Sequence, residues 1–177
     1  MNIERERRWL VRREDIPAEV LAAPAEHITQ GYLSPFKLLP VVRVRLLREA
    51  HATAPHRGVQ TVKMPRADGM AEVEFDIPLG KAEELMSLKL AGLTKVRHTY
   101  PLSEALAYEV DLFEGEHLGK LCIVEIELPA YDVPLDIPNW FGPEITGIRE
   151  LSNVSLAYYP ILAAGIADEL WAAKNKS

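Results

Sequence analysis

The feature that most constrains this fold is a set of short segments in which charged or polar residues stand two positions apart. Seven segments carry such a pair: Glu4 and Glu6 (with Arg8 in the same phase), Arg43 and Arg45, Thr61 and Lys63, Glu72 and Glu74, Lys95 and Arg97, Glu109 and Asp111, and Glu125 and Glu127. The intervening residues are mostly apolar. Successive side chains of a β-strand point to opposite faces, so the pattern predicts strands with one charged and one apolar face.

The signs of the charges indicate what the charged faces do. An antiparallel sheet with its polar face in solvent is the ordinary explanation of such alternation. Here basic pairs and acidic pairs lie on different segments, which favours a charged site. For a charge taken singly, above all Glu72 or Glu109, a solvated surface charge or a cross-strand ion pair is the competing explanation. Arg5 and Arg7 make the first segment polar on both faces, which fits an edge strand or a hydrated interior.

Three stretches favour helix. They are about Ile16 to His27, Gly80 to Ala91, and the region from about Ser152 onward, which Pro160 interrupts. Turn-forming residues at 65–69 and 114–119 separate several of the expected strands. No repeat or flexible linker divides the chain, so we expect residues 1–177 to form a single domain.

Composition excludes several classes of function. A formal net charge of −6 argues against binding to nucleic acid or to an anionic membrane. The chain has no apolar run long enough for a membrane span and no signal-like N-terminus, so a cytoplasmic location is expected. The single cysteine, Cys122, can form neither an intrachain disulfide nor a thiolate zinc site. The abundant carboxylates favour a hard cation held by oxygen.

In their order, these segments resemble the CYTH superfamily, also called the triphosphate tunnel metalloenzymes. The start, Glu4-Arg5-Glu6-Arg7-Arg8, is similar to the signature Glu-x-Glu-x-Lys, with Arg8 where lysine is usual. The other pairs follow in sequence, together with the segments Gln30 to Ser34 and Trp140 to Thr146. Each piece alone is common, whereas their number and order across residues 3–156 carry the resemblance.

The resemblance implies an α+β, mainly β fold: an eight-stranded antiparallel β-barrel, or tunnel, with helices packed outside. It also implies a small-molecule triphosphate as ligand and Mg²⁺ or Mn²⁺ as cofactor. Metal-dependent hydrolysis of inorganic tripolyphosphate is the expected activity. Class IV adenylate cyclase, thiamine triphosphatase and a non-catalytic polyphosphate- or nucleotide-binding module are the alternatives, because one fold hosts several activities. The sequence leaves a homodimer open.

The resemblance also assigns roles to residues. It implies metal binding by Glu4, Glu6 and Glu127 with Glu125 nearby, and triphosphate binding by Arg8, Arg43, Arg45, Lys63, Lys95 and Arg97. Arg8, Glu74 and Asp111 are the expected catalytic residues: Arg8 stabilises the transition state because guanidinium stays protonated, and the two acids orient basic side chains or metal-bound water. Six bases against eight acids give the expected lining a charge of −2, which a divalent cation reverses.

Three further residues are expected to have packing roles. Tyr32 and Trp140 could stack on a base, but their spacing favours sheet packing and loop anchoring. His98 follows Arg97 and is expected to pack in the structure rather than to take part in catalysis.

Overall fold

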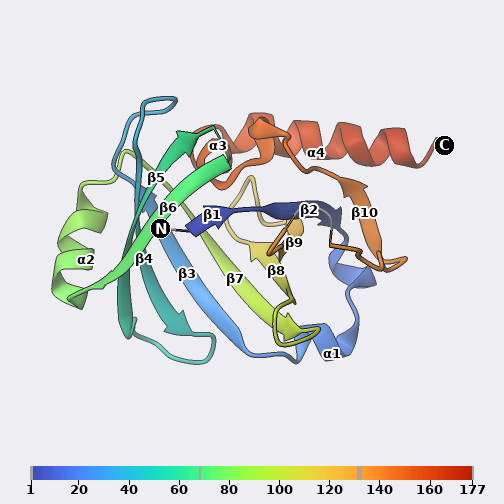
Figure 1. Ribbon diagram of the computed structural model, residues 1–177, viewed down its shortest axis with the longest axis horizontal. Coiled ribbons are helices and arrows are strands. Elements are labelled where there is room, and N and C mark those ends of the chain that lie inside the picture. Colours follow the sequence, from blue (N-terminus) through green and yellow to red (C-terminus); the bar gives the residue numbers. More distant parts are fainter. Residues whose placement is uncertain (1, 68, 131–132, 177) are drawn as a thin grey trace.

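The protein forms one antiparallel sheet of ten strands (Figure 1). The computed structural model describes residues 2–67, 69–130 and 133–176, and the side chains of residues 5–67 within the first range. The strands are β1 (Asn2–Glu4), β2 (Glu6–Val11), β3 (Ala25–Tyr32), β4 (Val41–Glu49), β5 (Arg57–Arg66), β6 (Gly69–Ile77), β7 (Ala91–Pro101), β8 (Ala107–Phe113), β9 (Cys122–Glu127) and β10 (Phe141–Glu144). Their order across the sheet is β1-β6-β5-β4-β3-β7-β8-β9-β2-β10. The prediction of a mainly β, antiparallel fold is confirmed.

The expected closed barrel of eight strands is not confirmed. The hydrogen-bonded sheet is open, with β1 and β10 as its edges. Arg5 separates β1 from β2: the first pairs with β6 and the second with β9, so the two lie end to end and do not pair with each other. Residues 2–11 thus lie along β6 near one edge of the sheet and along β9 near the other, and the strands curve around the space between (Figure 1).

The inward face of several strands changes from apolar to charged along its length. Leu10, Leu93, Phe113 and Ile123 belong to one buried cluster. Two positions away on the same faces lie charged residues: Arg8, Lys95, Asp111 and Glu125. Leu151 and Leu156, both fully buried, complete the apolar cluster. Every second side chain of each strand still points inward, but these side chains are apolar at one end of the interior and charged at the other.

Short helices cover the sheet. They are α1 (Ala18–Leu21), α2 (Leu79–Ser87), α3 (Asn153–Tyr158) and α4 (Pro160–Lys174), with 3₁₀ turns η1 (Arg13–Asp15) and η2 (Arg149–Leu151). Pro160 separates α3 from α4, as predicted, and stands in the first turn of α4. The expected helix over Gly80 to Ala91 is shorter, because β7 begins at Ala91. None of the helices among the described residues has the length and apolarity that crossing a bilayer requires.

The expected helix from Ile16 to His27 is wrong beyond Leu21. Pro24 has no N–H to donate and disfavours helical geometry at Ala23, so the helix ends before it. The following residues form β3, which pairs with β4 on one side and β7 on the other. Hydrogen bonds to two neighbouring strands outweigh the local helical preference on which the expected helix rested.

Candidate functional site: a charged cavity inside the sheet

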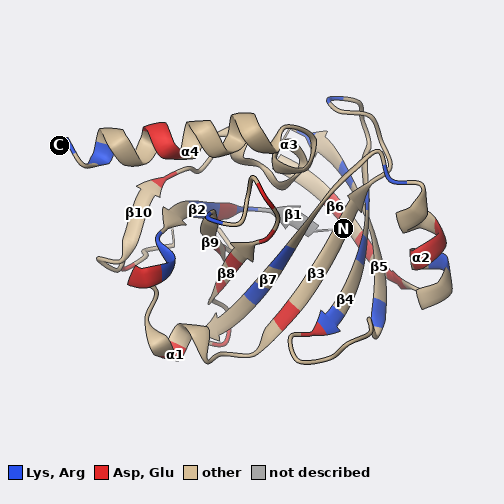
Figure 2. Ribbon diagram, turned by 180° about the vertical axis from the view of Figure 1, so that it is seen from behind, with Lys and Arg blue, Asp and Glu red and all other residues tan. Residues whose placement is uncertain are grey.

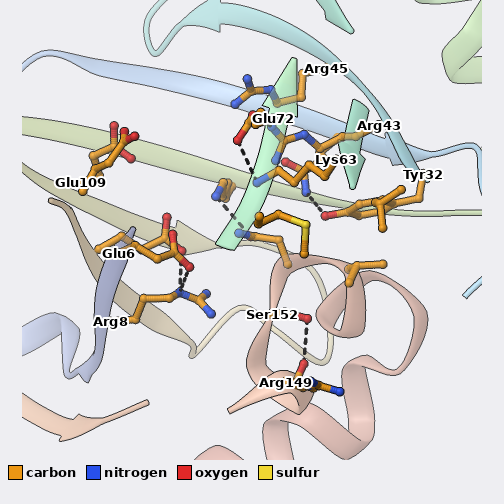
Figure 3. Close-up of a pocket in the computed structure, with 18 of the residues that line it drawn as sticks. Glu6, Arg8, Tyr32, Arg43, Arg45, Lys63, Glu72, Glu109, Arg149 and Ser152 are labelled. Atoms are coloured by element: carbon orange, nitrogen blue, oxygen red, sulfur yellow. Dashed lines mark hydrogen bonds and ion pairs between the residues drawn. The ribbon is translucent and has the colours of Figure 1, made fainter. Parts of the chain in front are cut away.

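A cavity of about 720 Å³ lies within the curve of the sheet. Its lining comes from the eight strands β2 to β9 and from residues 146–154 around η2 and the start of α3 (Figure 3). Seven basic and six acidic side chains of the described residues line it: Arg8, Arg43, Arg45, Lys63, Lys95, Arg97 and Arg149; Glu6, Glu72, Glu74, Glu109, Glu125 and Glu127. Residues far apart in the sequence are thus brought into one site.

The described lining side chains sum to +1, where the expected set summed to −2. Two of the three units of difference come from Asp111, which is fully buried behind the lining, and from Arg149, which joins the lining without having been expected there. The third comes from Glu4, which this sum does not include. The side chain of Glu4, a predicted metal ligand, lies outside the described residues, although the backbone of Glu4 pairs with Met70 of β6.

One side of the cavity, the β7–β9 wall, consists of Lys95, Arg97, Asp111 and Glu125. Asp111 accepts hydrogen bonds from Lys95 Nζ and from Arg97 Nε (2.7 Å) and Nη2 (2.6 Å). Glu125 accepts from Arg97 Nη2 (2.7 Å) and from Arg8 Nε (2.8 Å). Asp111 therefore contacts the cations of the site rather than the cavity, which suits an orienting role. The two acids fix three cations in place.

Burial and charge shift the pKa values on this wall in opposite directions. Burial alone would raise the pKa of Glu125, but Arg8, Arg97 and Lys95 outweigh it and hold that pKa well below its usual range. Burial, together with the neighbouring Arg97, lowers the pKa of Lys95 to about 8 against the attraction of Asp111. Lys95 is thus a cation at neutral pH whose charge changes within reach of mildly alkaline conditions.

The opposite side, the β4–β6 wall, consists of Arg43, Arg45, Lys63, Glu72 and Glu74. Arg43 Nη2 donates to Thr61 Oγ1 (3.1 Å) and lies 3.4 Å from Glu74 Oε2. Arg45 Nη2 donates to the same Glu74 oxygen, and Lys63 Nζ lies 3.2 Å from Glu72 Oε2. In Figure 2 basic positions mark β4 and β7, and acidic positions mark β8. Opposite signs on strands that are adjacent or one strand apart give each wall its ion pairs.

Among the described side chains, three buried guanidinium nitrogens have no hydrogen-bond partner. They are Arg8 Nη2, Arg43 Nε and Arg45 Nε, and all three atoms are buried. A buried donor without a partner costs roughly 1–3 kcal/mol, and more when it is charged. All three side chains line the cavity. Burial, with the neighbouring Arg43, lowers the pKa of Arg45 to about 10, so Arg45 remains cationic at neutral pH. These donors are suited to an anion inside the cavity.

Glu6 and Glu127 offer the best fit to a metal ion. They are direct register partners on β2 and β9, and both line the cavity. Two like charges placed opposite each other on a sheet are unfavourable unless a cation lies between them. Carboxylate oxygens are the ligands that Mg²⁺ prefers. Within the part of the chain that the structure describes, no cluster of three or more metal-ligating side chains occurs.

Glu125 fits a metal less well than expected. Its two carboxylate oxygens accept from Arg8 and Arg97, at 2.8 Å and 2.7 Å. Direct coordination would compete with both ion pairs. Glu74, expected to be catalytic, accepts from Thr61 Oγ1 (2.9 Å) and from two arginines, and it lines the cavity.

The sequence reasoning missed the residues that the C-terminal region adds. Arg149, Ser152 and Asn153 line the cavity from η2 and the start of α3 (Figure 3). The period-two pattern could not find them because they lie in η2 and at the start of α3, not in strands. Their polar side chains around the expected start of the C-terminal helix were the available signal.

Tyr32 and Trp140, the two aromatic residues considered for stacking on a base, lie in different parts of the structure. Trp140 packs edge-on against Tyr108 and Phe141, with ring centroids 5.7 Å and 4.5 Å apart, in an apolar cluster outside the cavity. Tyr32 is buried, lines the cavity and accepts from Gln30 Nε2 through its hydroxyl at 2.8 Å. His98 Nδ1 lies 3.4 Å from the carbonyl oxygen of Ala23.

The overall structure resembles solved structures, whereas comparison with known families and with curated proteins gave no match. The inorganic triphosphatase NE1496 is 27% identical with a TM-score of 0.61, and the match covers 89% of this chain and 95% of that one. The PH1819 protein of Pyrococcus horikoshii OT3 is 20% identical with a TM-score of 0.54, covering 73% and 80%. The putative adenylyl cyclase HpAC1 of Hippeastrum is 14% identical with a TM-score of 0.55, covering 72% and 80%.

At their identities the Pyrococcus and Hippeastrum proteins bear on the fold alone, whereas the match to NE1496 extends over nearly the whole of both chains. The antiparallel sheet, the charged side chains that line its cavity and the match to NE1496 are consistent with the resemblance to the CYTH superfamily.

Proposed function

We propose that this protein hydrolyses a small triphosphate, inorganic tripolyphosphate, with Mg²⁺ or Mn²⁺ as cofactor. The observation that carries the proposal is the set of buried, partnerless N–H groups on Arg8, Arg43 and Arg45. Guanidinium groups suit phosphate oxygens because their planar donors match the geometry of the anion. We further propose that residues 1–177 act as one domain whose sheet encloses the substrate as a tunnel.

The walls would bind the phosphates from both sides. Arg43, Arg45 and Lys63 approach from the β4–β6 wall, and Lys95 and Arg97 from the β7–β9 wall. A lining charge of +1 attracts an anion only weakly, since a triphosphate carries about four negative charges at neutral pH. A divalent ion held by Glu6 and Glu127, and by Glu4 in our proposal, adds the missing positive charge beside the phosphates.

Such an ion, when bound, supplies positive charge that stabilises phosphate oxygens and lowers the pKa of water. Arg8 lies between Glu6 and Glu125, with Nε 3.5 Å and 2.8 Å from their oxygens. Because guanidinium does not give up its proton, Arg8 stabilises charge on the transferring phosphoryl group and accepts no proton. Glu74 and Asp111 orient the basic residues that touch the phosphates.

Two observations favour a small triphosphate over a nucleotide. Tyr32 is the one aromatic side chain among the described lining residues, and it is buried against the wall. Trp140, the other candidate for stacking on a base, packs elsewhere. The structural neighbour NE1496 is an inorganic triphosphatase. We therefore place hydrolysis ahead of cyclisation.

A substrate panel tests the proposal. Phosphate release is measured with tripolyphosphate, thiamine triphosphate, ATP and GTP, each with Mg²⁺, with Mn²⁺ and with chelator. We expect metal-dependent release that is fastest with tripolyphosphate. Equal or faster turnover of a nucleotide or of thiamine triphosphate would overturn the substrate, and cyclic AMP from ATP would establish a cyclase. Tight binding of tripolyphosphate with no turnover under any condition would show that the protein is a non-catalytic binding module.

A further inference from the structure

The C-terminal segment supplies one polar contact to the basic residues of the cavity. Asn153, the first residue of α3, accepts a hydrogen bond through Oδ1 from Lys95 Nζ at 3.3 Å. Lys95 Nζ also donates to the fully buried Asp111. An ammonium group has three donors, so one N–H remains after these two bonds. Lys95 lines the cavity, where that donor can meet a ligand.

The position of Asn153 is fixed by its neighbours. Ser152 caps α3 by accepting from the backbone N–H of Ser155 (3.3 Å), and both serine hydroxyls donate to the carbonyl oxygen of Arg149 at 2.7 Å. Leu151 and Leu156, on either side, are fully buried. The segment is therefore held before any ligand arrives, and it presents Asn153 to β7 from outside the sheet.

We propose that Asn153 is a positioning residue, which holds the Lys95 ammonium so that its remaining N–H faces the substrate phosphates. The inference rests on the function proposed above. It gives the C-terminal segment a part in anion binding that the strand pattern does not contain. Asn153 acts through Lys95 and needs no contact with the substrate itself.

The surroundings of Lys95 make its protonation a sensitive readout. Asp111 faces it from β8, Glu125 from β9 and Arg97 from its own strand. From β3, the register partner of Lys95 is the uncharged Ile28. Asn153 is the polar contact from α3, and its oxygen favours the charged form of the lysine. Removing that acceptor lowers the pKa of Lys95, and replacing it with a carboxylate raises it.

The test is an NMR titration of the Lys95 side chain, identified by its absence from the spectrum of Lys95→Arg. Asn153→Leu keeps the volume but removes the acceptor, and Asn153→Asp replaces it with a charge. We expect Leu to shift the titration to lower pH and Asp to shift it higher by about one pH unit. Asn139→Asp, on an exposed loop, is the charge-matched control and should shift nothing.

The two variants distinguish a positioning role of Asn153 from a role that only excludes water. If Asn153 only excluded water, Asn153→Leu, which keeps the volume, would leave the lysine titration where it is in the wild type, and that result would overturn the proposal. No shift in Asn153→Asp would also overturn it. Calorimetry with tripolyphosphate and chelator supplies the second readout: the alkaline loss of affinity should move with the lysine titration. A wild-type protein that binds no tripolyphosphate would refute the proposed function, while the titration would still decide the role of Asn153.

Discussion

The two walls of the cavity use the same residue types in different ways. On the β7–β9 wall both acids are deeply buried: Asp111 is fully buried and the Glu125 side chain is 8% exposed. On the β4–β6 wall the acids are more accessible, with 18% exposure for Glu72 and 35% for Glu74. The first wall has its ion pairs built into the protein interior, and the second keeps them near water.

This difference shows which charges serve the fold and which are available to a ligand. Breaking a buried ion pair leaves an uncompensated charge, whereas a partly exposed one is screened. Two of the three partnerless N–H groups, on Arg43 and Arg45, belong to the β4–β6 wall. We infer that the β7–β9 wall keeps its basic side chains in fixed positions and that the β4–β6 wall supplies adaptable contacts to the anion.

The largest expected effect tests the structural role of the β7–β9 wall. Asp111→Asn removes the shared carboxylate of Lys95 and Arg97, and it should lower the free energy of unfolding by about 3–5 kcal/mol. Glu74→Gln is the matched substitution on the other wall and should cost roughly 1 kcal/mol or less. Denaturant unfolding of both variants measures the difference. Equal losses would abolish the distinction between the walls.

The next effect concerns the metal. Glu6→Gln and Glu4→Gln each remove a carboxylate charge with little change in volume, so both should abolish metal-dependent hydrolysis and leave the folded structure unchanged. Calorimetry with Mn²⁺ alone should show weaker binding in each variant, because a hard cation prefers charged oxygen ligands. Circular dichroism is the control for folding. Wild-type rates in either variant would refute the metal assignment.

A smaller effect tests the ligand role of the β4–β6 wall. Arg43→Gln should weaken tripolyphosphate binding roughly 10- to 100-fold, the loss expected for a charged hydrogen bond of about 1.5–3 kcal/mol. The free energy of unfolding should change little, because Arg43 has an unused donor and sits among accessible acids. Arg7→Gln is the control, since Arg7 pairs with Glu144 of β10 and lies outside the cavity lining. A large loss of stability in Arg43→Gln would show instead that Arg43 serves mainly to stabilise the fold.

The smallest effect is a pH dependence that belongs to Lys95. Its pKa of about 8 means that the lysine is charged below that pH and neutral above it. Affinity for tripolyphosphate should therefore fall as pH rises through 8, by about tenfold for one charged contact. Calorimetry between pH 6 and 10 measures it, with Lys63→Arg as a variant that should keep the same midpoint. A flat profile would contradict the assigned contact.

Much of the site could be predicted from the sequence because strands report their faces directly. The pairs at 43 and 45, 95 and 97, and 125 and 127 all reach the cavity, since a period of two fixes which side chains share a face. Asp111 lies on the predicted face of β8, but its side chain is buried behind the residues that line the cavity. Periodicity gives the face of a residue but not its depth, which depends on the length of the side chains in front.

The failures have physical causes that a local pattern does not contain. The segment after Pro24 reads as helix, yet it forms β3 because β4 and β7 offer it hydrogen bonds on both edges. The expected barrel is not confirmed: β1 pairs with β6 and β2 with β9, but the two do not pair with each other, and a local pattern does not show which strands pair. Arg149 and Asn153 escaped notice because they lie in η2 and at the start of α3, outside the strands that show the period of two.

The sequence by itself determined which segments alternate, the chemistry of their charged faces and the family resemblance that their order carries. These follow from alternation, which is a local property of the backbone. Only the tertiary structure decided which charges are paired, which are buried and which N–H groups are left for a ligand. Those depend on distances between segments that lie far apart in the chain, such as Lys95 and Asn153, and packing sets those distances.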